Sequence, residues 1–403
     1  MLNRRSFMHR VGVLGAAGVY FGETLIAGNA QADVRVQPPA KTPSKVWLDA
    51  NENSAGPPPS AIEAIVQSAP HTGRYHFDEF GEFARAIGAS EQVSPGQVLF
   101  GVGSSEVIAS AIAAFTTESK PMITASPTYD IIVQLARAMG KAVVEIPLTP
   151  PQWAYPVKQL AEEAKKAGGG LIYLCNPNNP TGSITSVEDV RWLMSNLPPD
   201  TVLFVDEAYL EFADPAKVES AIKYVREDKS VVVTRTFSKI YGMAGVRAGF
   251  GCARPDLISA MNPFMDNVIP YLGIRAAMAA LQEKATLIPE RRKNNARIRG
   301  ELCQWLDQNK VRYIPSQANF VMIDVKRDVR EFSAAMFREG VAVGRPFPPL
   351  TNMLRVTVGN AAEMQRFRQA FSKVYSALSV AALSRSRLYR PARAVPAPAE
   401  RWE

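Results

Sequence analysis

Short apolar runs rich in β-branched residues alternate with amphipathic stretches along the middle of the chain. The runs are too short for helices and the stretches between them have helical spacing. The pattern therefore predicts a parallel or mixed sheet that is buried on both faces. Its predicted strands are Val98–Phe100, Met122–Thr124, Val143–Ile146, Leu171–Leu174, Val202–Val205 and Val231–Arg235. Helices are predicted to begin at Ser60, as N-cap, and to span Glu106–Phe115 and Ile131–Met139.

A second group of predicted elements follows a long helical stretch, Ala276–Asn309, which we expect to be interrupted at Pro289. Its strands are Asn319–Val325, Val341–Gly344 and Leu354–Val358, and its helices are Val329–Glu339 and Ala361–Val380. These elements predict a smaller α+β domain. Residues 384–403 are rich in proline, alanine and arginine, which is typical of a disordered tail.

Residues 1–32 have the features of a targeting segment and not of a folded domain. Paired arginines followed by a hydrophobic residue, in Asn3–Met8, resemble a twin-arginine export signal. A short apolar stretch and a small-x-small cleavage site, Ala30–Ala32, follow. The stretch holds several glycines and Glu23, so no stable membrane span is expected. We predict export by the twin-arginine machinery to the periplasm or the exterior.

Composition and charge limit the classes of function. The chain is 47% hydrophobic and 21% charged, which indicates a large buried core. Its net charge is +8, but no basic run is interleaved with aromatic residues, so no nucleic-acid partner is predicted. The three cysteines and three histidines lack the spacing of metal ligands, so no metal site is predicted.

Lys239 is the first candidate for chemistry because it follows a predicted buried strand. Considered alone, it would be a solvent-exposed loop lysine. However, Thr236 and Ser238 place hydroxyl groups beside it, and Arg247 follows eight residues later. Hydroxyls and a guanidinium together are suited to binding a phosphate.

Three other segments place polar groups at the ends of predicted strands. Asp206 follows Val202–Val205, and a carboxylate buried there needs a partner such as a protonated pyridine nitrogen, unless it is a helix N-cap. The segment Asn176–Gly182 is a turn after another strand. The glycine-rich turn Gly101–Glu106 precedes a helix whose N-terminal N–H groups could bind an anion.

The order of these motifs resembles that of fold-type I pyridoxal 5′-phosphate (PLP) enzymes. Asn-Pro-x-Asn-Pro-Thr-Gly at 176–182, Asp-x-x-Tyr at 206–209, Ser238-Lys239 and Arg247 follow one another as in class I/II aminotransferases. Other segments are similar to the histidinol-phosphate aminotransferase branch, namely Leu48–Asn53, Arg74-Tyr75, Pro127–Tyr129, Ser316–Phe320 and Leu354–Gly359. The resemblance covers roughly residues 45–380.

This resemblance implies a role for each matching residue. Lys239 would be the Schiff-base lysine and proton carrier, Asp206 would hold the pyridinium proton, and Tyr209 would be the third catalytic residue. Cofactor contacts are further implied for Ser104, Ser105, Tyr129, Asn179, Thr236, Ser238 and Arg247, and for Tyr75 of a neighbouring subunit in a homodimer. Substrate contacts are implied for Arg355, through a bidentate pair with a carboxylate, and for Asn53 and Arg345.

The resemblance also implies the fold. An α/β large domain with a central, mostly parallel, seven-stranded sheet flanked by helices would be joined by a smaller α+β domain. The expected divisions are the signal peptide at 1–32, an arm with part of the small domain at 33–74, the large PLP-binding domain at 75–300, the C-terminal small domain at 301–383, and the tail at 384–403.

The implied activity is transfer of an amino group between an L-amino acid, or a related amine, and a 2-oxo acid by a ping-pong mechanism. An aromatic amino acid, a glutamate-like donor and histidinol phosphate all remain open as donors. Three segments depart from the histidinol-phosphate branch, namely Ser54–Gly56, His76–Asp78 and Gly340–Pro349. The alternatives are a PLP decarboxylase or β-lyase of the same fold, and a non-catalytic exported binding protein.

Overall fold

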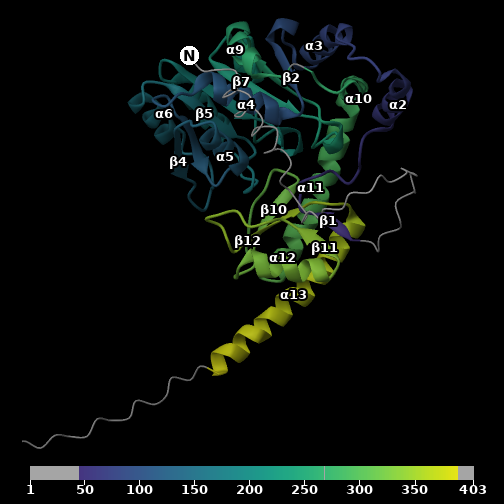
Figure 1. Cartoon of the computed structure of the whole chain (residues 1–403). Coiled ribbons are helices and arrows are strands. Elements are labelled where there is room, and N and C mark those ends of the chain that lie inside the picture. The colour runs from purple at the N-terminus through teal and green to yellow at the C-terminus, as the bar shows by residue number, and fades with distance from the viewer. Residues whose placement is uncertain (1–44, 267, 389–403) are drawn as a thin grey trace, which may run out of the picture. The chain divides into compact units, whose positions relative to one another are not determined.

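The computed structural model describes residues 45–266 and 268–388 of the chain (Figure 1). The expected signal peptide at 1–32 and the first part of the expected arm, residues 33–44, lie outside these residues. The described part contains two groups of strands and helices, each built around its own hydrophobic core.

A seven-stranded sheet is the centre of the larger group. Its strands are β2 (Val98–Gly101), β3 (Met122–Ser126), β4 (Val143–Pro147), β5 (Gly170–Cys175), β6 (Thr201–Asp206), β7 (Val231–Thr236) and β8 (Gly249–Ala253). The strand order is β2-β8-β7-β6-β5-β3-β4, and only the pairings of β8 with β2 and β7 are antiparallel. The predicted mostly parallel, seven-stranded α/β sheet is confirmed.

The hydrophobic pattern missed one strand of this sheet, β8, because glycine is its first and third residue. Helix α4 (Ser104–Phe115) lies directly against this strand. A Cβ atom on Gly249 would stand 2.3 Å from the backbone nitrogen of Ser104, and one on Gly251 would stand 2.7 Å from Val107 Cγ1. Glycine is required for this close approach. Because Gly249 pairs in register with Thr236, the contact brings the start of α4 to the end of β7.

The two faces of the sheet have different surroundings, because successive side chains of a strand point to opposite faces. Residues that pair in register point to the same face of a sheet. Asp206 pairs with Thr234, and Thr234 pairs with Gly251, which faces α4. Helix α3 (Asp78–Glu91) covers the opposite face, where the Phe83 ring lies 5.5 Å from that of Phe100. The α4 face therefore carries Asp206, and the α3 face carries its neighbour Glu207.

The remaining helices of the larger group lie around this sheet, except α2, which packs on α10 (Figure 1). They are α2 (Pro59–Ser68), α5 (Asp130–Ala138), α6 (Val157–Lys166), α7 (Val187–Ser195), α8 (Ile222–Arg226), α9 (Pro255–Met261) and α10 (Tyr271–Gln282), with short 3₁₀ turns η1 (Ala69–His71), η2 (Pro95–Gln97), η3 (Leu210–Phe212), η4 (Ala244–Val246) and η5 (Asn262–Phe264).

Two predicted helix features were wrong. The N-cap of α2 is Pro58 and not Ser60, because Pro59 at the first helical position already has the φ angle that a helix needs. The predicted interruption at Pro289 falls at Glu283, between α10 and α11 (Lys284–Gln308). Pro289 lies inside α11, near its start, where the helix tolerates the loss of one hydrogen bond.

The smaller group contains two small sheets. Strand β1 (Val46–Leu48) pairs in parallel with β11 (Val341–Val343), and β9 (Tyr313–Ile314), β10 (Phe320–Asp324) and β12 (Met353–Thr357) form an antiparallel sheet. Helix α12 (Val329–Arg338) and the C-terminal half of α11 pack on them. Ile288 belongs to the first core and Ile298 to the second, so the two groups divide inside α11.

The last helix, α13 (Ala361–Leu388), is longer than predicted. The first residues of the expected tail, 384–388, are helical in the structure, and the rest of the tail lies outside the described residues. Across residues 45–266 and 268–388, no helix combines the length and apolarity of a membrane span. No cluster of His, Cys, Asp and Glu suited to a metal ion occurs in the same residues.

Candidate active site

Lys239 lies in the loop that follows β7, at the edge where the parallel strands end. Its Nζ donates a hydrogen bond to the carbonyl oxygen of Ala50 at 3.2 Å and lies 5.7 Å from the centre of the Tyr209 ring. Burial, reinforced by the charge of Arg355, lowers the pKa of Lys239 to about 8. The lysine is therefore a better nucleophile near neutral pH, because more of it is unprotonated.

Asp206 ends β6, and its side chain is buried. Oδ1 accepts a hydrogen bond from the N–H of Ala208 at 3.0 Å, and Oδ2 accepts one from the hydroxyl of Tyr173 at 2.8 Å. Both donors are neutral. Burial raises the pKa of Asp206 to about 6, although the two hydrogen bonds oppose that shift. A buried carboxylate with neutral partners is suited to a ligand that brings its own positive charge.

Tyr209 lies three residues after Asp206, and its hydroxyl accepts hydrogen bonds from two side-chain amides. The donors are Nδ2 of Asn51 at 3.1 Å and Nδ2 of Asn179 at 3.5 Å. Burial raises the pKa of Tyr209, so the phenol keeps its proton. Its hydrogen remains able to reach an oxygen of a ligand.

Arg355 comes from β12 in the smaller group and contacts the larger group. Its Nη1 donates to Oδ1 of Asn179 at 2.7 Å, and its Nη2 donates to the carbonyl oxygen of Asp49 at 2.7 Å. Its Nε is buried without a hydrogen-bond partner. Burial lowers the pKa of Arg355 to about 10, which still leaves the guanidinium charged at neutral pH. A buried guanidinium with an unused N–H is suited to a carboxylate.

The start of α4 lies beside Arg247. Gly103, the N-cap of the helix, has a φ angle of +79°, and a Cβ atom there would stand 2.4 Å from Nη2 of Arg247. Nη1 of Arg247 donates to Oγ of Ser238 at 3.4 Å and to the carbonyl oxygen of Ala244 at 2.9 Å. The N–H of Ser238 donates to Oγ1 of Thr236 at 3.1 Å. The structure thus brings a guanidinium, two hydroxyls and a helix N-terminus together, a combination that binds phosphate.

Tyr129 precedes α5 and lies near both Asp206 and Arg247. Burial and the charge of Asp206 raise the pKa of the Tyr129 phenol, whereas the side chain of Ser105 lowers it, and the net rise keeps the ring neutral. Ser104 and Ser105 are the first two residues of α4, so the helix begins two residues earlier than predicted.

Asn53 and Arg345, both predicted to bind substrate, have protein partners in the structure. Nδ2 of Asn53 donates to the carbonyl oxygen of Ile240 at 2.9 Å, and Oδ1 accepts from the N–H of Ala55 at 3.1 Å. Nη2 of Arg345 pairs with the two carboxylate oxygens of Asp130 at 2.6 and 2.8 Å. Asn53 holds the loop beside Lys239, and Arg345 joins the smaller group to α5. Their substrate contacts stay predictions.

Tyr75 lies on the surface of the larger group, with 66% of the residue exposed. Its ring stacks on that of Phe77 at 5.3 Å. Between them in sequence, His76 stacks on Tyr271 of α10 at 3.8 Å. The predicted contact of Tyr75 with a cofactor in a neighbouring subunit stays a prediction.

Sequence reasoning missed two residues of the site. Asn51 belongs to the motif Leu48–Asn53, but its contact with Tyr209 depends on features of the fold. The backbone of Asn51 is left-handed, with φ of +55°, and Nδ2 of Asn319 donates to the carbonyl oxygen of Asn51 at 3.0 Å. Tyr173 lies in the middle of β5, where a tyrosine is usually part of the core. No local sequence signal marks its hydrogen bond to Asp206.

The charges of the site are unbalanced. Lys239, Arg247 and Arg355 are cationic groups whose direct hydrogen-bond partners are all neutral, whereas Asp206 is the nearby carboxylate with neutral partners. A phosphate near Arg247, a protonated ring nitrogen near Asp206 and a carboxylate near Arg355 would balance these charges. The residues present therefore fit PLP together with an anionic substrate.

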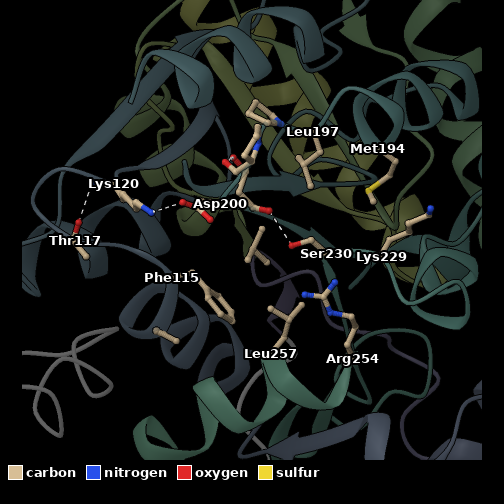
Figure 2. A pocket seen from close by; sticks show the side chains of 15 residues that line it. Phe115, Thr117, Lys120, Met194, Leu197, Asp200, Lys229, Ser230, Arg254 and Leu257 are labelled. Atoms are coloured by element: carbon tan, nitrogen blue, oxygen red, sulfur yellow. Dashed lines mark hydrogen bonds and ion pairs between the residues drawn. The ribbon is translucent and has the colours of Figure 1, made fainter. Parts of the chain in front are cut away.

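A separate hollow of about 620 Å³ lies where β6 and β7 begin, at the opposite ends of the strands (Figure 2). Phe115 and Leu257 line it together with Lys120 and Arg254. Both cations pair with neighbouring aspartates, at 3.2 and 2.8 Å. None of the predicted site residues lines this hollow, so it is not the candidate active site.

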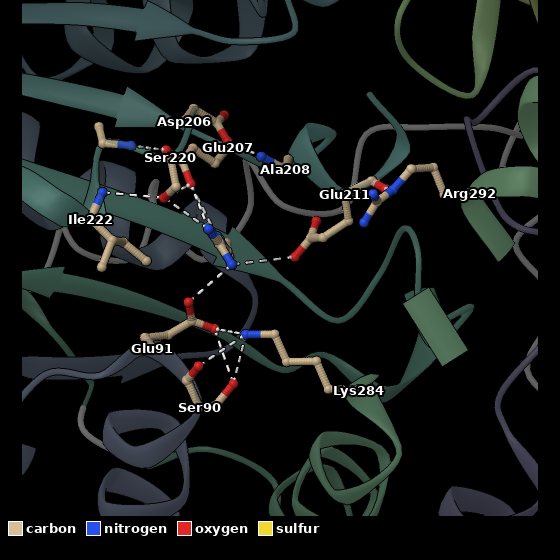
Figure 3. Close-up of polar contacts among 12 residues, drawn as sticks. Ser90, Glu91, Asp206, Glu207, Ala208, Glu211, Ser220, Ile222, Lys284 and Arg292 are labelled. Carbon is tan, nitrogen blue, oxygen red and sulfur yellow. Dashed lines mark hydrogen bonds and ion pairs between the residues drawn. The ribbon is translucent and has the colours of Figure 1, made fainter. Parts of the chain in front are cut away.

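A network of buried charges lies behind the site, on the α3 face of the sheet (Figure 3). Arg235 of β7 donates to Glu207 through Nε and Nη2, each at 3.0 Å, and to Glu91 through Nη1 at 3.0 Å. Glu211 lies 3.8 Å from Arg235, and Lys284 donates to Glu91 at 2.6 Å. Burial alone would lower the pKa of Arg235, but the three glutamates outweigh it and raise that pKa. Burial raises the pKa of Glu211 to about 7.

Comparisons with known proteins agree with this geometry. A family model described as "Aminotransferase class I and II" matches residues 43–371. The chain is 33% identical to a histidinol-phosphate aminotransferase of Symbiobacterium thermophilum over 331 residues, which cover 81% of this chain and 89% of that protein. A putative histidinol-phosphate aminotransferase of Erwinia carotovora atroseptica has a similar structure, with a TM-score of 0.79, 30% identity, and coverage of 82% of this chain and 97% of that one. The histidinol-phosphate aminotransferase of Sinorhizobium meliloti, solved in complex with pyridoxal-5′-phosphate, gives a TM-score of 0.76 at 26% identity and covers 83% of this chain and 92% of that one.

Proposed function

This chain belongs to the class I and II aminotransferases, and from that premise we propose which substrates its PLP-dependent site accepts. It exchanges an amino group between an L-amino acid, or a related amine such as histidinol phosphate, and a 2-oxo acid by a ping-pong mechanism. Arg355 binds the anionic group of the donor. The similarity to histidinol-phosphate aminotransferases supports histidinol phosphate as one candidate donor.

The observation that carries this proposal is the state of Arg355. The residue is 8% exposed, its Nε lacks a hydrogen-bond partner, and its other guanidinium nitrogens donate to an amide oxygen and a carbonyl oxygen. Leaving a buried N–H unsatisfied costs about 1–3 kcal/mol, so a substrate anion that accepts it would gain affinity. A donor whose anionic group is held by Arg355 would have its amino group oriented for reaction.

The other residues of the site would bind the cofactor and transfer a proton. Arg247, Ser238 and Thr236 would hold the phosphate of PLP, Asp206 its protonated ring nitrogen, and Tyr209 with Asn179 its ring oxygen. When bound, PLP supplies a carbon that carries the amino group and a ring that withdraws electrons from the substrate. Nζ of Lys239 is placed to take a proton from the donor and to return it.

We expect Arg355→Lys to raise the KM for the amino donor at least about 10-fold while kcat falls by less than about 3-fold. The change keeps the charge but removes one of the two parallel N–H groups, and losing one charge-assisted hydrogen bond costs roughly 1.5–3 kcal/mol. Steady-state kinetics with saturating oxo acid measure the effect. Arg254→Lys, on a surface pair with Asp256, is the matched control. An unchanged KM for Arg355→Lys would mean that the anion is bound elsewhere.

The donor and the acceptor are identified by a substrate screen. Holoenzyme is mixed with aromatic amino acids, glutamate and histidinol phosphate in turn, and loss of the cofactor's visible absorbance reports the first half of the reaction. A donor without an anionic group should fail. The decarboxylase and β-lyase alternatives are not favoured, because the matched relatives named above are aminotransferases.

The functional unit is proposed to be a homodimer in which Tyr75 reaches the partner's cofactor phosphate. The support is a group of exposed apolar residues near α10, with exposures of 66% for Tyr75, 58% for Phe77, 66% for Val66 and 50% for Ile62. The last two lie on α2, which packs on α10. Burying such side chains is favourable, so a second copy could cover them. A single-chain mass by light scattering at micromolar concentration would contradict this proposal.

Export is proposed on the sequence of residues 1–32 alone. A twin-arginine route carries folded proteins, which suits an enzyme that acquires its cofactor before crossing the membrane. We expect a reporter fused to residues 1–35 to reach the periplasm, and the Arg4→Lys, Arg5→Lys double variant to stay inside the cell. Fractionation of cells that carry each fusion measures this, and equal export of the two fusions would exclude the twin-arginine route.

A further inference from the structure

Tyr173 is a fully buried tyrosine whose hydroxyl contacts the carboxylate of Asp206. Its backbone pairs in register with Phe204 of the next strand, and its ring stacks on that of Phe204 at 5.9 Å with an interplanar angle of 18°. Because Phe204 and Asp206 are two residues apart on β6, both point to the same face. The phenol of Tyr173 on β5 therefore reaches the diagonal position on the neighbouring strand β6, where it donates to Oδ2 of Asp206 at 2.8 Å.

We propose that Tyr173 is a positioning residue that fixes the plane of the Asp206 carboxylate and keeps it a weak base, so that the proton it shares with the cofactor stays on the ring nitrogen. This inference rests on the cofactor assignment made above. Tyr173 acts through Asp206 and touches neither substrate nor the reacting atoms.

The hydroxyl is not needed for packing. The contact with Phe204 uses the ring, and a phenylalanine at this position would keep it. The phenol has one hydrogen, and that hydrogen is committed to Asp206. Oδ1 of the same carboxylate accepts a hydrogen bond from the N–H of Ala208. Each oxygen of Asp206 therefore has one donor, and the two bonds together fix the plane of the carboxylate.

The electrostatics have the direction that this role requires. Burial raises the pKa of Asp206, whereas the hydrogen bonds from Tyr173 and Ala208 lower it. Losing the Tyr173 bond would make the carboxylate more basic, and a more basic carboxylate draws the shared proton away from the ring. A less cationic ring withdraws fewer electrons, which weakens the chemistry that depends on it.

The test is Tyr173→Phe holoenzyme, titrated with pH while the cofactor's visible absorbance is recorded. A less cationic ring lets the nitrogen linked to Lys239 hold its proton to higher pH. We expect the absorbance midpoint to rise by about half a pH unit or more, and kcat to fall about 10-fold with little change in KM. Tyr173 replaced site-specifically by 3,5-difluorotyrosine, a stronger hydrogen-bond donor, should move the midpoint in the opposite direction, which lost packing could not do.

Two comparisons show whether the effect passes through Asp206. Tyr313→Phe removes a tyrosine–aspartate hydrogen bond of the same kind, to Asp307 at 3.2 Å in the smaller group, and should leave the midpoint unchanged. In an Asp206→Asn background, Tyr173→Phe should produce no further shift. A Tyr173→Phe midpoint equal to that of the wild type, or a full shift that persists in the Asp206→Asn background, overturns the proposal. A wild type without the absorbance contradicts the proposed function instead, so the two failures are distinguishable.

Discussion

Lys239→Ala is expected to lower kcat by more than about 10⁴-fold, because the variant loses the amine that we propose as both nucleophile and general base. The proposed phosphate and ring contacts are made by Arg247 and Asp206, so the variant should still bind PLP without forming a covalent link. Turnover is measured with saturating donor and acceptor, and the link is measured by borohydride reduction followed by mass spectrometry.

Two controls separate this role from a general effect of losing a lysine. Lys229→Ala removes an exposed lysine at the opposite ends of the strands and should leave kcat unchanged. A small primary amine added to Lys239→Ala should restore part of the activity by acting as the missing base. Full activity of Lys239→Ala without added amine would refute the catalytic assignment.

Arg235→Ala is expected to lower the free energy of unfolding by about 3–5 kcal/mol, a large part of the stability of an ordinary protein. The change leaves Glu91 and Glu207 buried without the guanidinium that both accept from. It also releases the ends of β6 and β7, which carry Asp206 and precede Lys239. Urea unfolding followed by circular dichroism measures the loss.

The pH dependence of this loss identifies its cause. Burial raises the pKa of Glu207 and Glu211 in the folded state. Without Arg235 these carboxylates would hold protons to still higher pH, so the loss should be smaller at pH 6 than at pH 8. Arg254→Ala, which breaks an exposed pair with Asp256, should cost at most about 1 kcal/mol at either pH. An equally small loss for Arg235→Ala would show that the network adds little stability.

Much of the larger group could be predicted from the sequence because buried parallel strands are short, apolar and β-branched. The strand β8 could not, since its glycines are required by the contact with α4 and glycine gives no strand signal. The break between α10 and α11 was also misplaced. A proline is a strong local signal, but α10 ends at Gln282 and α11 continues through Pro289.

The position of a candidate site residue was predictable where a polar residue ends an apolar strand, as Asp206 does, or closely follows one, as Lys239 does. Arg355 was assigned from the resemblance, and the structure adds the reason, a buried guanidinium with an unsatisfied Nε. Tyr173 was not predictable. Its contact with Asp206 depends on the register of β5 against β6, and register is a property of the folded sheet.

The central claim, that this chain transfers amino groups, is tested most directly by a half-reaction. Holoenzyme is mixed with an accepted amino donor in the absence of any 2-oxo acid, and the products are separated by chromatography. We expect one equivalent of pyridoxamine phosphate and one of the donor's oxo product, an oxo acid or a ketone, per active site, and regeneration of PLP when a 2-oxo acid is added. Release of CO₂ or pyruvate while PLP remains unchanged would contradict it.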